Sequence, residues 1–210
     1  SGADMERFRG FNEDYLRKEF SLSPRAKILG NIGYLVGHKG QKYLIQAMAK
    51  VVQKFPEVHL LIVGKGKLEK ELKALTAELG LQQHITFTGF REDIGAFLNL
   101  LDLLVVSSTG EGLSATIVDA LALEVPVVAT DAGGIPEIIT PGETGIIVLQ
   151  ANPEALAQGI LWTLNNYDKA KEMARRGRRN VAERFSADAM VEGNLHVYKQ
   201  LIRERRTCCA

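Results

Sequence analysis

The sequence predicts a doubly wound α/β domain, in which a six-stranded parallel sheet of the Rossmann-like type carries helices on both faces. Short runs of β-branched and aliphatic residues alternate with amphipathic stretches of helical period, which is the pattern of repeated strand–helix–strand units. The runs are apolar at consecutive positions, as in Leu60–Val63 and Leu103–Val106. Such runs are typical of strands that are covered on both faces in a parallel sheet.

Each element follows from a local pattern. Between the strands, apolar residues recur at helical spacing, and in residues 67–79 the leucines are separated by 4, 3 and 4 positions. We place the strands at Lys27–Ile32, His59–Val63, Ile85–Thr88, Leu103–Ser107, Val125–Thr130 and Gly145–Val148. We place the helices between them at Gln41–Phe55, Lys67–Leu79, Asp93–Leu100, Ser114–Leu123 and Ile135–Ile139.

After Val148 the strand pattern stops, and three further helices are expected. Pro153 suits the first turn of a helix, where its missing N–H costs nothing, and Ser186 suits an N-cap. The expected helices run from Pro153 to about Asn166, over Asp168–Arg184 and over Ser186–Arg206. We therefore divide the chain into a Rossmann-like domain (1–168), C-terminal helices that pack on it (169–206) and a tail (207–210).

Composition excludes several classes of protein. A hydrophobic content of 46%, with 20 Gly and 6 Pro, excludes a disordered or collagen-like chain. No apolar run reaches the roughly 20 residues of a membrane span, and no signal peptide opens the sequence. The only cysteines, Cys208 and Cys209, are adjacent and cannot form a disulfide framework. We therefore expect a cytoplasmic location.

The net charge of +1 hides an asymmetry, because residues 169–210 carry 11 Lys and Arg against 5 Asp and Glu. A nucleic-acid surface would interleave aromatic residues or Gly with this charge, so no nucleic-acid partner is expected. We interpret the basic excess as a solvated helical face. The alternative is contact with an anionic membrane surface, at the inner face of the membrane.

The loops that follow the strands are the place to look for a ligand, since doubly wound sheets bind ligands outside the carboxyl ends of their strands. All six of these loops contain Gly. Glycine lets a ligand approach the backbone closely, so this edge of the sheet is expected to bind one, although any single loop could be a simple turn.

Several common motifs are incomplete. Gly64 and Gly66 begin a dinucleotide fingerprint, but Glu69 stands at its third glycine position. The sequence has no P-loop, no Gly-x-Ser-x-Gly elbow, no Asp-x-Asp pair and no His/Cys cluster at ligand spacing. A dehydrogenase is therefore disfavoured, and we expect neither a serine nucleophile nor a protein-bound metal or other cofactor.

Two acids eight positions apart, Glu111 and Asp119, are the most informative pair. Ser114 between them suits a helix N-cap, and the free N–H groups of the first turn could bind an anion such as pyrophosphate. Eight helical residues span about 12 Å, so an acid at each end could accept hydroxyl groups of a nucleotide sugar while Lys39 meets its phosphates. The alternative is an ordinary loop acid and a helix-surface acid.

Taken in order, the motifs of nearly the whole chain resemble the C-terminal, donor-binding domain of the retaining GT-B glycosyltransferases of family 4, called the glycosyl transferases group 1 domain. The resemblance implies one half of a GT-B fold. The residues that carry it are Gly2-Ala3-Asp4 with Phe8, Gly33 with Lys39-Gly40, Leu61–Gly66, Phe87–Phe90, Glu111–Ala122, Val125–Thr130, Gly133–Glu137, Gly142–Gly145 and Arg184–Ser186.

The resemblance also implies a reaction and a site. A sugar would pass with retention from a nucleoside diphosphate to an acceptor hydroxyl, without a bound metal. Glu111 would contact the sugar, Asp119 the ribose and Lys39 the diphosphate, with Glu111 and Lys39 as the catalytic residues. The implied donor-binding residues are Gly33, Tyr34, Lys39, Gly64, Phe90, Arg91, Glu111, Gly112, Leu113, Ser114, Ala115, Thr116 and Asp119.

Three positions depart from the family pattern: Tyr34 replaces a usual Arg, Ser114 a usual Gly, and Asp119 a usual Glu. These departures leave two alternatives open, a catalytically decayed nucleotide-binding or scaffold domain and a GT-B-like sugar-nucleotide epimerase. The chain begins without Met where the family crosses between its domains. We therefore expect a missing N-terminal acceptor domain as its partner and no turnover by this chain alone.

Overall fold

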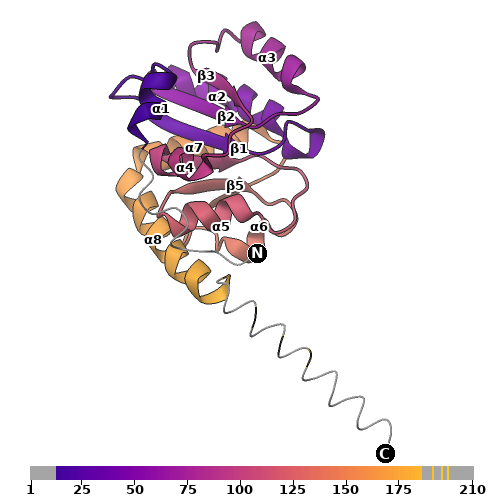
Figure 1. The fold of residues 1–210 in the computed structure, drawn as a ribbon, viewed down its shortest axis with the longest axis vertical. Helices are drawn as coiled ribbons and strands as arrows, with labels where there is room; N and C mark the ends of the chain where they lie inside the picture. Colours follow the sequence, from indigo (N-terminus) through magenta and orange to yellow (C-terminus); the bar gives the residue numbers. More distant parts are fainter. Residues whose placement is uncertain (1–12, 186–190, 192–194, 196–197, 199–210) are drawn as a thin grey trace, which may run out of the picture.

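The computed structural model describes residues 13–185 together with 191, 195 and 198, and it has the predicted doubly wound architecture (Figure 1). Six parallel strands form one sheet in the order β3-β2-β1-β4-β5-β6. Each predicted strand is present, with ends within two residues of the predicted ones. The strands are β1 (Lys27–Ile32), β2 (Val58–Val63), β3 (Ile85–Gly89), β4 (Leu103–Val106), β5 (Val127–Thr130) and β6 (Ile146–Val148).

The strand order reverses between β1 and β4. β1 pairs with β2 along its whole length, but it pairs with β4 only through Leu29 with Leu103 and Gly30 with Leu104. At such a reversal the loops after the two strands diverge to opposite faces of the sheet and leave a crevice between them. The topology therefore places the loops after β1 and β4 around one cleft.

Helices cover both faces of the sheet, each over its own apolar core (Figure 1). Neighbouring strand residues alternate between the cores, so that Ile28 contributes to one and Leu29 to the other. One face carries α2 (Gln41–Lys54), α3 (Glu69–Glu78) and α7 (Pro153–Asn165). The other carries α1 (Asp14–Glu19), α4 (Ile94–Leu100), α5 (Ala115–Ala122), α6 (Ile135–Ile138) and α8 (Tyr167–Arg184).

The helices also agree with the predicted ranges to within two residues, with two additions. The sequence analysis missed α1 and a short 3₁₀ helix, η1 (Gly37–Lys39). Of the predicted helix Ser186–Arg206, only Val191, Leu195 and Tyr198 are described, and these three are helical and exposed. The rest of that helix and the tail lie outside the described residues. No helix of the described part is long and apolar enough to cross a membrane.

The amino end of β1 is fastened by one carboxylate. Asp102, just before β4, accepts hydrogen bonds from Lys27 Nζ at 2.8 Å, the Ile28 N–H at 2.8 Å and the Tyr167 hydroxyl at 3.2 Å. Burial, followed by the charge of Asp102, raises the pKa of Tyr167 well above its ordinary value. This cluster ties β1, β4 and α8 together at the edge of the sheet opposite the cleft.

Candidate active site

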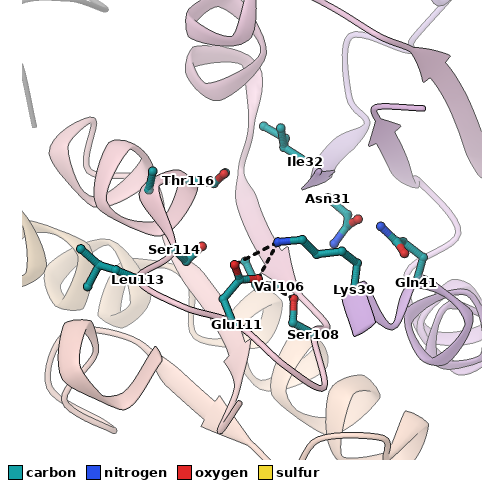
Figure 2. Close-up of a pocket in the computed structure, with 11 residues that line it drawn as sticks. Asn31, Ile32, Lys39, Gln41, Val106, Ser108, Glu111, Leu113, Ser114 and Thr116 are labelled. Atoms are coloured by element: carbon teal, nitrogen blue, oxygen red, sulfur yellow. Dashed lines mark hydrogen bonds and ion pairs between the residues drawn. The ribbon is translucent and has the colours of Figure 1, made fainter. Parts of the chain in front are cut away.

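The loops after β1 and β4 border a cleft of about 270 Å³ at the carboxyl edge of the sheet (Figure 2). One wall comes from β1 and the start of α2, and the other from the end of β4, its following loop and the first turn of α5. The lining residues are Asn31, Ile32, Lys39, Gln41, Val106, Ser108, Glu111, Leu113, Ser114, Ala115 and Thr116. The cleft thus lies where the sequence predicts ligand binding.

The two predicted catalytic residues, Lys39 and Glu111, bind each other across this cleft. Lys39 Nζ lies 2.7 Å from Glu111 Oε2 and 3.0 Å from Oε1, and the Ser108 hydroxyl donates to Oε2 at 2.8 Å (Figure 2). The side chains of Lys39 and Glu111 are 24% and 12% exposed. The carboxylate is therefore held by two donors from opposite walls of the cleft.

Lys39 is positioned by close contact between its own loop and the loop after β4. Gly40 has a φ of 64°, and a Cβ there would lie 2.1 Å from the Ser107 carbonyl oxygen. The Ser107 hydroxyl donates to the Lys39 carbonyl at 3.0 Å, and the Thr109 N–H donates to the His38 carbonyl at 2.7 Å. These bonds join the two loops directly beneath the lysine side chain.

Glu111 is positioned from its other side by the loop after β5. The Gly134 N–H donates to the Glu111 carbonyl at 3.1 Å, and a Cβ on Gly133 would lie 1.8 Å from that carbonyl oxygen. The sequence analysis attributed the rim glycines to close approach of a ligand. At Gly40 and Gly133 the close neighbour is instead the backbone of another loop, which helps to fix Lys39 and Glu111.

The first turn of α5 faces the cleft through Ser114, Ala115 and Thr116. Ser114 occupies the predicted N-cap position with an extended backbone, but its side chain makes no capping hydrogen bond within the described structure. The position was correct and the side-chain cap was wrong. Backbone N–H groups at this helix end have no partner within the helix, so they are suited to an anion in the cleft. Asp119 lies half-buried farther along α5 and does not line the cleft.

Five lining residues are absent from the predicted site: Asn31, Ile32, Gln41, Val106 and Ser108. The amides of Asn31 and Gln41 lie beside the Lys39 side chain (Figure 2). Asn31 Nδ2 donates to the Val105 carbonyl at 2.9 Å, and Gln41 Nε2 donates to the Tyr34 carbonyl at 3.0 Å. Both amide oxygens are buried and have no hydrogen-bond partner among the described residues. An asparagine inside the apolar strand 27–32 is the signal that could have revealed this feature.

A second hollow of about 200 Å³ lies next to the cleft, and Ile32 lines both spaces. It gathers five predicted residues from the ends of β1, β2 and β3: Gly33, Tyr34, Gly64, Phe90 and Arg91. The residues Tyr34 and Phe90 are 66% and 59% exposed. Lys65 Nζ lies 5.1 Å from the centre of the Phe90 ring, so that a cation covers one aromatic face of this hollow.

The Arg91 side chain stabilises the fold through hydrogen bonds to two carboxylates. It donates to Asp93 at 2.7 and 2.9 Å and to Glu19 of α1 at 2.6 and 3.1 Å. These hydrogen bonds lower the pKa of Asp93 to about 2, and Asp93 also accepts the Tyr15 hydroxyl. Arg91 therefore joins α1 to the loop after β3, and it also lines the hollow.

Comparisons with known proteins agree with this geometry. The chain is 28% identical over 189 residues to the N-acetyl-alpha-D-glucosaminyl L-malate synthase of Bacillus anthracis, covering 90% of this chain and 49% of the relative. The structure of Anabaena HepE in complex with UDP and glucose matches with a TM-score of 0.84 at 27% identity, over 96% of this chain and 55% of that one.

A third structure, the C-terminal domain of LpcC from Francisella tularensis, shares the fold with a TM-score of 0.79 at 24% identity, over 89% of this chain and 100% of that domain. The chain spans about half the length of the curated relatives it matches. The sequence model of one family, Glycosyl transferases group 1, matches residues 12–180. The chain belongs to the Glycosyl transferases group 1 family.

Proposed function

We propose that this chain is the donor-binding domain of a retaining glycosyltransferase of family 4, which transfers a sugar from a nucleoside diphosphate to an acceptor hydroxyl. The observation that carries the proposal is a pair of neighbouring spaces at the carboxyl ends of the strands, the cleft and the hollow, both lined by Ile32. The cleft offers a lysine, a carboxylate and a helix N-terminus, and the hollow offers two exposed aromatic rings. The UDP-glucose complex of the HepE relative supports this reading.

In this proposal the diphosphate occupies the cleft and the nucleobase occupies the hollow. Lys39 is the one cation among the described residues that line the cleft, and the first turn of α5 lies opposite it. The rings of Tyr34 and Phe90 offer flat apolar surfaces to a base, and Arg91 lines the same space. Asp119 of α5 lines neither space, and we assign it the ribose hydroxyls on the family resemblance.

The chemistry asked of these residues is electrostatic. As the bond between sugar and phosphate breaks, negative charge grows on the leaving diphosphate. Lys39 and the N–H groups at the start of α5 are preorganised donors for that charge, because the loops that hold them are bonded to one another. Glu111 accepts hydrogen bonds from sugar hydroxyls and so fixes the orientation of the donor.

The proposal extends to the remainder of the enzyme. We assign the acceptor site to an N-terminal domain, in keeping with relatives about twice as long as this chain. α8 packs against α5, which supports the treatment of the helix that begins the C-terminal part of the chain as docked on a Rossmann-like unit. α8 carries the exposed Arg175, Arg176 and Arg179, a charged surface suited to the cytoplasm or to the inner membrane surface.

Calorimetric titration of the chain with UDP, GDP and ADP tests the proposal. One of them should bind, and Lys39→Met should weaken that binding by roughly tenfold or more, since a hydrogen bond to a charged group contributes about 1.5–3 kcal/mol. Lys42→Met is the matched control, because Lys42 is a lysine nearby on α2 that does not line the cleft. Equal losses in both variants would contradict the phosphate role of Lys39.

A further inference from the structure

We infer that Glu111 is a specificity-determining residue that competes with a nucleoside diphosphate for Lys39, so that the site prefers the intact nucleotide sugar to the spent nucleotide. This inference rests on the proposed function, in which Lys39 binds the diphosphate. It adds a second role to Glu111, one that acts after the sugar has been transferred.

Lys39 and Glu111 form an ion pair across the cleft. Both hydrogen bonds that Lys39 Nζ makes within the described structure go to Glu111, at 2.7 and 3.0 Å. The carboxylate lies mostly out of water, with 12% of its side chain exposed. The Lys39 ammonium is already neutralised by the Glu111 carboxylate. A diphosphate that enters the cleft must therefore break this ion pair to bind Lys39.

Glu111 is restrained from moving away to make room. The Ser108 hydroxyl holds its carboxylate at 2.8 Å, and the Gly134 N–H holds its backbone carbonyl at 3.1 Å. When Lys39 turns to a phosphate, the carboxylate stays beside the ligand and loses a charged partner. Like charges at close range in a partly desolvated cleft oppose binding.

The nucleotide sugar and the nucleoside diphosphate differ in the hydrogen-bond donors that they offer to Glu111. A nucleotide sugar carries hydroxyl donors that can replace the lost hydrogen bonds from Lys39. A nucleoside diphosphate ends in phosphate oxygens, which supply no such donors at neutral pH. Glu111 therefore stabilises the complex before transfer and weakens the complex left after transfer, which favours release of the spent nucleotide.

Glu111→Gln is the decisive variant, because the amide keeps the size of the side chain and removes the competing charge. We expect it to tighten binding of the nucleoside diphosphate roughly tenfold, while binding of the matching nucleotide sugar stays unchanged or weakens. Glu137→Gln is the control, because Glu137 is an exposed acid on α6, near the loop that holds Glu111. It removes the same charge from the same edge and should change both affinities less than about twofold.

Two further readouts separate competition for Lys39 from a general loss of negative charge. In the parent the site is a neutral pair, so added NaCl should change diphosphate affinity little, whereas in Glu111→Gln the dependence on salt should be steep. In a Lys39→Met background there is no lysine to compete for, so Glu111→Gln should keep only the part of its tightening that comes from removing like-charge repulsion. Full tightening without the lysine would overturn the inference.

The outcomes distinguish this inference from the proposed function. Unchanged or weaker diphosphate binding by Glu111→Gln, with Lys39→Met still harmful, would refute the competition and leave the donor site standing. Failure of both parent and Glu111→Gln to bind UDP, GDP or ADP would refute both. Thermal unfolding of each variant checks the fold, and Glu111→Ala carries the same expectation for the diphosphate should the glutamine side chain disturb the loop.

Discussion

Replacing Gly133 by alanine should disturb the contact between the loops after β4 and β5, which holds Glu111 in position. Gly133 has a φ of 54°, and a Cβ there would lie 1.8 Å from the Glu111 carbonyl oxygen, far inside van der Waals contact. The left-handed backbone costs a non-glycine residue about 1 kcal/mol. Relief of the clash requires the two loops to separate, which breaks the bond from the Gly134 N–H to Glu111 and costs about 1 kcal/mol more.

The expected loss is thus about 2 kcal/mol, which lowers the melting temperature of a domain this size by about 4–8 °C. Gly142→Ala is the matched control, because Gly142 also has a positive φ, of 76°, but nothing lies within 4 Å of the position that an alanine methyl group would take there. That variant should lose only the backbone contribution, about 1 kcal/mol or about 2–4 °C.

Differential scanning calorimetry measures both losses in stability. Amide hydrogen exchange at Gly134 reports whether the bond from its N–H to the Glu111 carbonyl is intact. Exchange of this amide should be faster in Gly133→Ala and unchanged in Gly142→Ala. Equal melting temperatures in the two variants, or a Gly134 amide that stays protected, would show that the contact between the loops after β4 and β5 does not hold Glu111.

Three carboxylates give further predictions. Asp102→Ala should lower stability by about 3 kcal/mol in urea unfolding, at about 1 kcal/mol for each hydrogen bond from Lys27, Ile28 and Tyr167, without changing nucleotide affinity. Because the pKa of Asp93 is lowered from 3.8 to about 2, its ionised form stabilises the fold by about 2 kcal/mol above pH 4, and this contribution is lost as pH falls through 2. The stability gap between parent and Asp93→Asn should therefore close over that range, and a constant gap would contradict it. Asp119→Asn should weaken a nucleoside diphosphate and its nucleotide sugar alike, by roughly fivefold in calorimetry, and selective loss of one ligand would refute the ribose assignment.

The sheet could be predicted because its strands are buried on both faces, and such strands are runs of consecutive apolar residues in the sequence. β2 is an example, since Leu60 to Val63 are all buried and all apolar. α1 has no such run. Leu16 is its one buried residue, and the helix is fastened by the bond between Glu19 and Arg91, 72 positions away. Tertiary contacts of that kind cannot be deduced from local periodicity.

The sequence and the family resemblance assigned Lys39 and Glu111 to one ligand at the carboxyl edge of the sheet, but they did not predict the contacts between them. The strand order, which brings the loops after β1 and β4 together, is known only from the structure. The direct pairing of Lys39 and Glu111 depends on η1 and on the left-handed Gly40, neither of which has a distinctive sequence signal. The unpaired amide oxygens of Asn31 and Gln41 likewise depend on side-chain orientation in three dimensions.

The short join between β1 and β4 has a consequence for the order of folding. Each half of the sheet forms from strands close in sequence, whereas Leu29 must meet Leu103 across a loop of 74 positions (103 − 29). Closing a loop of that length costs about 4 kcal/mol of chain entropy, so this pairing is expected late. The halves can then assemble while the cleft does not yet exist. A nucleotide that binds the finished cleft should slow unfolding in stopped-flow measurements and leave the folding rate unchanged.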